Sequence, residues 1–231
     1  MPQERPRGEN VVDLMEALRK SVGGAGSESN SEEGPQEAME ERTRLDRPYQ
    51  VREMLADPRH SRVVLINLTR GKRANVTAEF AARRRASLTL LPFCQEMFAV
   101  GQTAVGEYEP GQLAEHVADS IATLHIDDLS LWRDQRFTDS LIASNTGVIF
   151  LGGAWLEEEI FIAALEGVRR GYDVRLLADL SIPRLEADRS LVLDRLALHG
   201  VLTTTVRQAL LEWAVCLDDA SLTQRVRQLL S

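Results

Sequence analysis

The chain has 231 residues, of which 44% are hydrophobic and 27% are charged, the balance of an ordinary globular protein. This composition excludes a chain that is disordered from end to end, and the length suffices for one large domain or two small ones. The formal net charge of −8 and the two cysteines argue against a general nucleic-acid-binding protein, a disulfide framework and a structural zinc site.

The same features set expectations on location and cofactors. No apolar run reaches the ~20 residues that a membrane span needs, and residues 1–7 lack the apolar stretch of a secretory signal. We therefore expect a cytoplasmic protein with no membrane or nucleic-acid partner. The four histidines have no metal-ligand spacing, so we expect no metal and no other cofactor.

The first 46 residues differ in composition from the rest. Residues 10–22 carry apolar side chains at helical spacing behind Asn10, which can cap the first turn. Residues 22–42 combine glycine, serine and glutamate with few large apolar side chains, which is typical of a flexible acidic linker. We expect a flexible N-terminal arm over residues 1–46. Its short amphipathic helix either docks into a partner protein, packs on its own domain, or packs on nothing.

Strand-like and helix-like segments alternate from residue 47 to residue 231. Strands are expected at 62–67, 102–108, 129–132, 147–151, 173–179 and 201–204. Helices are expected at 77–100 with an interruption near Pro92, and at 111–124, 137–144, 160–170, 188–199 and 205–215. The segment 62–67 is a continuous β-branched run, typical of a strand buried on both faces. The alternation predicts right-handed crossovers and a mainly parallel sheet, with ligands bound outside the carboxyl ends of its strands.

The segment 148–179 reads VIFLGGAWLEEEIFIAALEGVRRGYDVRLLAD. It is expected to form, in this order, a strand, a Gly-Gly bend, a helix, a Gly-Tyr pair and a strand that reaches Asp179. The segment 193–211 adds a helix, a strand that ends in Thr-Thr, and a closing helix. This order is similar to that of the isochorismatase-like (cysteine hydrolase) family. The resemblance implies an α/β fold, a three-layer α/β/α sandwich with a mainly parallel six-stranded sheet (Rossmann-like), over residues 47–231.

The resemblance also implies three site positions. In the family a nucleophilic cysteine opens the helix, and its position falls on Glu159, six residues after Gly153 and twelve before Gly171. The aspartate that ends the first strand falls on Asn67, and the lysine of a middle strand falls on Arg133. In the family the thiolate is the nucleophile, the aspartate moves the proton and the lysine supports the charge.

None of these replacements keeps the family's chemistry. An amide transfers no proton, a guanidinium stays charged, and a carboxylate is a poorer acyl acceptor than a thiolate. The true isochorismatases of the family also lack the cysteine and cleave a vinyl ether with the aspartate, which is absent here as well. Neither Cys94 nor Cys216 is expected to take the place of the nucleophilic cysteine, because free cysteines are usually buried as small apolar residues. The further pocket candidates are Gly153, Trp155 and Asp128.

Glu159 has three interpretations: an acid favoured by the helix dipole with no chemical role, an ion pair with Arg133 that fills the ancestral pocket, or part of a reworked acid/base pair. We expect Trp132 and Trp213 to be packing residues, and Trp155 to line or plug the pocket. The basic clusters 70–73 and 83–85 are either a solvated helix face or a surface for an acidic partner or for the acidic residues 28–41.

Three functions remain open. The first is a binding, regulatory or scaffolding subunit without hydrolase activity; it would form a homo-oligomer, as the resemblance implies. The second is a hydrolase of a small amide or vinyl ether, with a site rebuilt around Glu159, Arg133 and either Asp127 or Asp128. The third is a small-ligand binder that keeps the pocket without the reaction.

Overall fold

The sheet consists of six strands that are all parallel. The computed structural model describes residues 55–70, 76–126 and 128–231, and the strands lie in the order β3-β2-β1-β4-β5-β6. They are β1 (Ser61–Ile66), β2 (Gln102–Val105), β3 (Ala122–Leu124), β4 (Val148–Ala154), β5 (Asp173–Ile182) and β6 (Leu202–Thr204). The chain extends from β1 to one edge and then returns to the other side of β1, so the predicted parallel sheet is confirmed.

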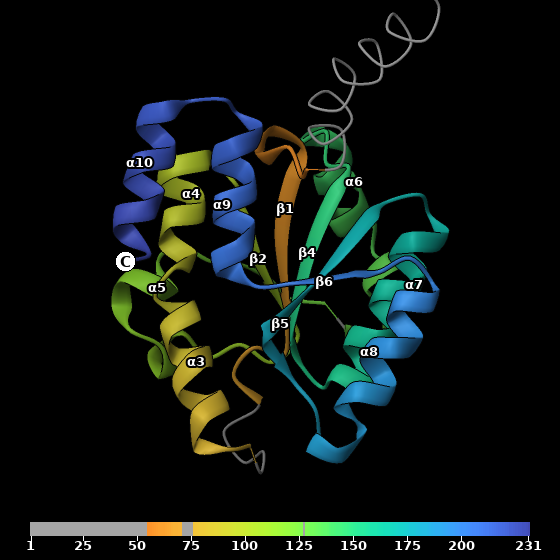
Figure 1. Cartoon of the computed structure of the whole chain (residues 1–231). Coiled ribbons are helices and arrows are strands. Elements are labelled where there is room, and N and C mark those ends of the chain that lie inside the picture. Colours follow the sequence, from red (N-terminus) through yellow and green to blue (C-terminus); the bar gives the residue numbers. More distant parts are fainter. Residues whose placement is uncertain (1–54, 71–75, 127) are drawn as a thin grey trace, which may run out of the picture. The chain divides into compact units, whose positions relative to one another are not determined.

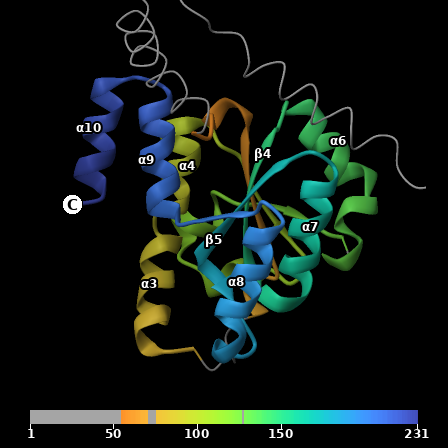
Figure 2. The same cartoon turned by 45° about the vertical axis from the view of Figure 1, so that its right-hand side comes forward.

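Helices cover both faces of the sheet (Figures 1 and 2). One layer holds α3 (Ala78–Leu88), α4 (Leu91–Phe98), α5 (Glu115–Ala118), α9 (Val206–Cys216) and α10 (Ala220–Leu229). The other layer holds α6 (Gln135–Ala143), α7 (Phe161–Arg169) and α8 (Arg189–Leu198). The three-layer α/β/α sandwich that the resemblance implies is therefore confirmed.

A large hydrophobic cluster fills each space between helices and sheet. Trp213 is fully buried on the α9 side, with its ring edge-on to Phe150 at a centroid distance of 5.0 Å. Trp132 lies in the other cluster, edge-on to Phe137 at 5.3 Å, and its indole nitrogen donates to the carbonyl of Ala163. Both tryptophans are packing residues, as predicted.

Two predicted segments have a different structure. The helix expected over 111–124 is reduced to the single turn of α5, and residues 122–124 form the edge strand β3. This strand is largely exposed, so its sequence lacks the continuous apolar run of a buried strand. The strand expected over 129–132 is a 3-10 helix, Asp128–Arg133, in which Leu131 and Trp132 pack beneath α7.

Helix α10 was not expected from the sequence. Asp219 accepts hydrogen bonds from the backbone N–H groups of Ser221 and Leu222 and so caps its first turn. Only Leu222 and Val226 are buried within the helix. A stripe this narrow, in an otherwise polar segment, gives a weak periodic signal.

The predicted arm over residues 1–46, with its helix at 10–22 and its acidic linker, lies outside the described residues. The described residues all belong to the unit 48–231. Among them, no helix is long and apolar enough to cross a membrane.

Asp179 is a buried carboxyl group near the end of β5, and the strand continues beyond it to Ile182. Both of its carboxyl oxygens accept from the backbone N–H of Val206, at 3.0 and 3.3 Å, at the first residue of α9. Burial raises the pKa of Asp179, partly offset by hydrogen bonds. The native state therefore binds the proton of Asp179 more tightly than the unfolded state does. This proton binding stabilises the native state at low pH, and the stabilisation is lost as the pH rises through the native pKa.

We expect Asp179→Asn to remove this penalty, because an amide oxygen still accepts from Val206 and carries no charge. The free energy of unfolding of the wild type minus that of Asp179→Asn should fall between pH 3.5 and pH 7, by about 1.4 kcal/mol for each unit by which the pKa is raised. Urea unfolding followed by tryptophan fluorescence measures this difference. A difference that stays constant or rises with pH would contradict the assignment.

Candidate active-site region

The strand order of the sheet reverses between β1 and β4. These strands are neighbours, but their chain connections lead to opposite edges of the sheet. In parallel α/β sheets, ligands bind outside the carboxyl ends of the strands at such a point. The segments that follow the strands here are 67–70 after β1, 106–109 after β2 and 155–160 after β4. We therefore place the candidate site at this edge.

An ion cluster joins these three segments. Arg70 Nη1 donates to Glu159 Oε1 at 2.5 Å, and Arg70 Nε donates to Glu107 Oε2 at 3.0 Å. The Arg70 side chain is 28% exposed and that of Glu159 is 10% exposed, whereas Glu107 is half exposed. The Arg70 guanidinium thus connects the carboxyl ends of all three strands and compensates a buried carboxylate.

Glu159 lies in the turn that begins α7. Trp155 starts this turn, and residues 156–160 form one wide helical turn before the regular helix. Glu159 Oε2 accepts from the backbone N–H of Trp155 at 3.2 Å, while Oε1 accepts from Arg70. Both carboxylate oxygens are therefore bound by protein donors, in addition to the favourable field of the helix N-terminus.

Asn67 directly follows β1 and is fully buried. Its backbone has a φ of 50°, in the left-handed region that asparagine adopts more readily than most residues. Its Oδ1 accepts from the backbone N–H of Glu107 at 2.7 Å, and its own N–H donates to the carbonyl of Val105. The amide thus joins the end of β1 to the end of β2.

Trp155 and Gly153 complete the region. The Trp155 ring packs with Ile182 and Phe80, and the Arg184 guanidinium lies 4.9 Å from its ring centroid. Gly153 has a φ of 130°, and a Cβ atom there would lie 1.7 Å from the carbonyl oxygen of Ile66. The peptide bond between Ala154 and Trp155 is cis. Trp155 packs against Ile182 and Phe80, and its role in lining or plugging a pocket stays a prediction. Gly153 allows β4 to approach β1.

Structures of known proteins share this architecture at low sequence identity. A MAR1 ribonuclease from Caenorhabditis elegans is 15% identical, with a TM-score of 0.60 over 76% of this chain and 91% of that one. The YcaC gene product of Escherichia coli, an octameric hydrolase of unknown specificity, is 18% identical, with a TM-score of 0.57 over 74% and 88%. An isochorismatase-like hydrolase from Alkaliphilus metalliredigens is 13% identical, with a TM-score of 0.50 over 66% and 96%. No protein-family model and no curated protein sequence matches the chain.

The chain has the isochorismatase-like fold. The fold that the resemblance implied is confirmed. At these identities the likeness shows the fold alone.

Within the isochorismatase-like fold, Asn67 and Glu159 both lie at the carboxyl ends of the neighbouring strands β1 and β4. Arg133 does not pair with Glu159. Arg133 is exposed at the end of the 3-10 helix 128–133. The partner of Glu159 is Arg70. The ion pair that we considered for position 159 therefore exists, with a different arginine. Asp127 and the side chain of Asp128 lie outside the described part of the structure.

Sequence reasoning missed Arg70 and Glu107 as members of this cluster. Arg70 follows β1 by four residues and Glu107 follows β2 by two. Because parallel strands end at one edge of the sheet, charged residues just after neighbouring strands can be expected to meet there. Arg70 is followed closely by the basic residues 72 and 73, and this run favours a surface patch over a single site residue.

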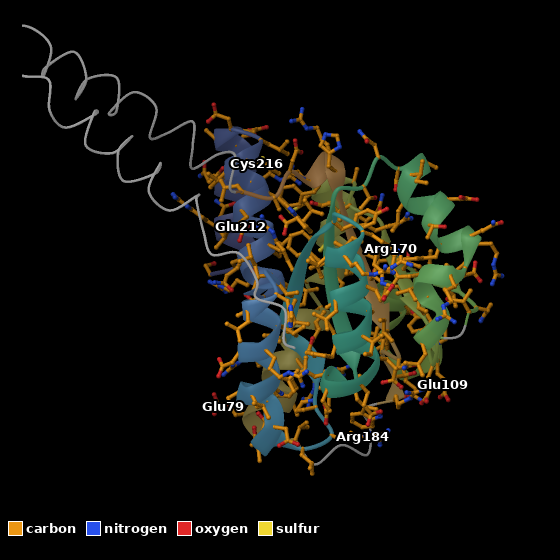
Figure 3. All side chains as sticks on the ribbon, turned by 90° about the vertical axis from the view of Figure 1, so that its right-hand side faces the viewer. Glu79, Glu109, Arg170, Arg184, Glu212 and Cys216 are labelled. Atoms are coloured by element: carbon orange, nitrogen blue, oxygen red, sulfur yellow. The ribbon has the colours of Figure 1, made fainter. Side chains whose placement is uncertain are left out.

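Neither thiol lies near Glu159. Cys94 is buried in α4, and burial raises the pKa of its thiol to about 12. Cys216 is partly buried at the end of α9. Figure 3 shows Cys216 far from Arg184, at the opposite end of the described domain. Arg184 forms an ion pair with Glu158, the residue that precedes Glu159, so Cys216 is also far from Glu159. The expected apolar role is confirmed for Cys94, and neither cysteine replaces the family's nucleophile.

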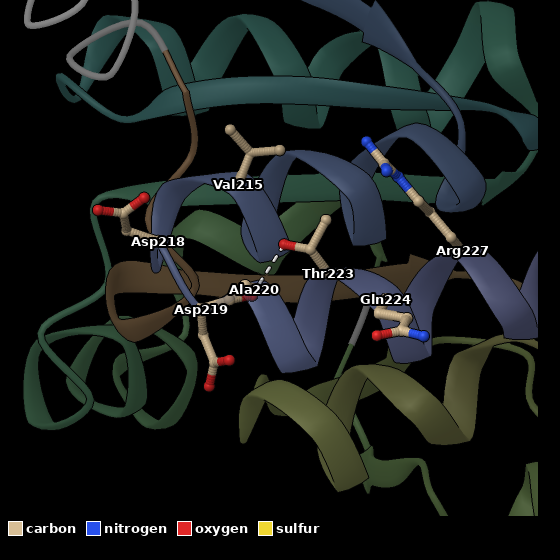
Figure 4. A pocket seen from close by; sticks show the side chains of 7 residues that line it. All are labelled: Val215, Asp218, Asp219, Ala220, Thr223, Gln224 and Arg227. Carbon is tan, nitrogen blue, oxygen red and sulfur yellow. Dashed lines mark hydrogen bonds between the residues drawn. The ribbon is translucent and has the colours of Figure 1, made fainter.

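A separate hollow of ≈ 650 Å³ lies where α9 turns into α10 (Figure 4). Asp219, one of its two acidic residues, caps α10, and the Thr223 hydroxyl donates to the carbonyl of Asp219 at 2.9 Å. These polar groups therefore serve the turn itself. Within the described residues, no three His, Cys, Asp or Glu side chains form a group that would hold a metal ion.

Proposed function

We propose that this chain works by binding, as a regulatory or scaffolding subunit with the isochorismatase-like fold, and that it does not hydrolyse amides or vinyl ethers. The observation that carries the proposal is the bonding of Glu159. By resemblance this residue stands at the nucleophile position, and both of its oxygens accept hydrogen bonds from protein donors. A carboxylate held in this way supports the interface between strands and is poorly placed to attack a substrate.

Asn67 supports the same conclusion. A hydrolase of this family moves a proton through an aspartate at this position, by resemblance. Here the Asn67 amide is fully buried and accepts from the backbone of Glu107, and an amide does not act as a general acid or base at neutral pH. Nucleophile and proton carrier are thus both replaced by groups that hold the carboxyl edge of the sheet together.

An assay of the full-length chain tests this proposal. We expect no release of ammonia from small aliphatic and aromatic amides, and no cleavage of a vinyl ether, above a protein-free blank. The variant Glu159→Ala should give the same result. Turnover by the wild type would contradict the proposal, and its loss in Glu159→Ala would assign it to a site rebuilt around Glu159.

We further propose that the subunit forms a homo-oligomer and that residues 10–22 contact a partner protein. The octameric assembly of the E. coli YcaC protein supports the first part. So do the exposed apolar side chains Leu191, Leu198 and Leu202 on α8 and the edge strand β6, which a second copy would cover. Light scattering measures the mass in solution, and a mass of 25.8 kDa would contradict self-assembly.

A further inference from the structure

A cavity of ≈ 620 Å³ lies between α3 and the segment that leads into α5. Both elements belong to the same helical layer (Figure 1). Ile182, at the end of β5, also lines the cavity. None of its lining residues belongs to the cluster of Arg70, Glu107 and Glu159. The cavity is therefore a separate feature of the carboxyl end of the sheet, and its volume is in the range of small-molecule sites.

Two arginines, Arg84 and Arg85, line this cavity; Arg85 is exposed, whereas Arg84 is half-buried. Arg84 Nη2 donates to the carbonyl of Leu68 at 2.7 Å, while its Nε is buried with no hydrogen-bond partner. Among the described residues, no carboxylate forms an ion pair with it, in contrast to buried Arg175, which contacts both Asp173 and Glu212. Burial without such a partner lowers the pKa of Arg84 to about 10.

At neutral pH the Arg84 guanidinium is therefore a half-buried cation that has no counter-charge within the described part of the chain. Such a group is costly, because it has lost part of its hydration and its hydrogen bond to Leu68 goes to a neutral acceptor. An anion that enters the cavity would provide a charge-assisted hydrogen bond. The neighbouring Arg83 does not share this property, since it is exposed and pairs with Glu79.

The rest of the cavity wall is mainly apolar. The apolar side chains that line it are Val76, Ala81, Leu88, Leu113, Ala114, Val117 and Ile182. A simple inorganic anion would leave these walls uncovered. A ligand with one anionic end and an apolar body would satisfy the guanidinium and remove apolar surface from water at once.

We propose that this cavity binds a small organic acid, with its carboxylate on Arg84 and its apolar body against Leu88, Val117 and Ile182. An acidic peptide segment such as residues 28–41 fits less well. It offers several charges but almost no large apolar side chains, so it would pair with Arg84 and leave the walls exposed. The proposal holds whether or not the chain has hydrolase activity.

Calorimetric titration of the full-length chain tests this site. The probes are hexanoate and phenylacetate, each compared with its uncharged amide, together with acetate, inorganic phosphate and a peptide of residues 28–41. We expect the two larger acids to bind at least tenfold more tightly than their amides and than acetate or phosphate. Arg84→Gln should weaken the binding of these acids at least tenfold, because it removes the charge.

Arg83→Gln is the matched control, since it makes the same charge change one residue away and should leave the affinity unchanged. Ala81→Phe fills the cavity without altering charge and should also abolish binding, which keeps the test valid if Arg84→Gln does not fold. Equal binding to the wild type, Arg84→Gln and Ala81→Phe would overturn the proposal. So would the absence of carboxylate binding at millimolar concentration, or binding of the acidic peptide alone.

Discussion

Arg70→Met is expected to lower the free energy of unfolding by about 3 kcal/mol at pH 7. The substitution keeps much of the side-chain volume but removes the guanidinium that binds Glu159 at 2.5 Å. The Glu159 side chain is only 10% exposed, and removal of one partner of a buried ion pair leaves a charge that water does not solvate. Urea unfolding followed by circular dichroism measures the loss.

A double-mutant cycle separates the ion pair from other contacts of Arg70. Glu159→Gln keeps an acceptor for the N–H of Trp155 but removes the charge. In the double variant with Arg70→Met, the loss should be smaller than the sum of the two single losses.

Arg83→Met is the matched control for this cycle. Arg83 and Glu79 form an ion pair of similar length, but both side chains are well exposed, so its loss should be within experimental error. If Arg70→Met is as stable as this control, the ion cluster does not hold the three strand ends together. The structural role that we assign to Glu159 would then be wrong.

The order of the fold could be predicted because its central strands are marked strongly in the sequence. β1 and β4 are buried along almost their whole length, and such strands appear as short continuous apolar runs. The edge strand β3 could not be found in this way. Its exposure to solvent at the edge of the sheet is set by the tertiary structure, and its three residues carry no pattern of their own.

The candidate site was predicted in position but not in pairing. The count of residues from Gly153 placed Glu159 at the start of a helix, and the end of an apolar run placed Asn67 at the end of a strand. Which arginine reaches Glu159 depends on how the loop after β1 turns back over the sheet edge. That path depends on the left-handed backbone of Asn67, which the sequence alone does not specify.

Gly153→Ala is expected to destabilise the fold by about 4 kcal/mol or more, and the chain should be largely unfolded at 37 °C. A Cβ atom at this position would lie 1.7 Å from the carbonyl oxygen of Ile66 and 2.7 Å from its carbon. The neighbour is strand backbone, which cannot rotate away as a side chain would. The φ of 130° adds a conformation that alanine avoids.

Gly147→Ala is the matched control, because it lies just before the same strand and a Cβ there meets nothing within 4 Å. It should leave the free energy of unfolding unchanged or raise it by up to ~1 kcal/mol, through the lower entropy of the unfolded chain. Thermal unfolding of both variants gives the comparison. If Gly153→Ala unfolds at the wild-type temperature, β4 does not approach β1 this closely at its carboxyl end. The start of α7, which places Glu159 against Arg70, would then need a different path, and Glu159 would not be held at the nucleophile position in the way we propose.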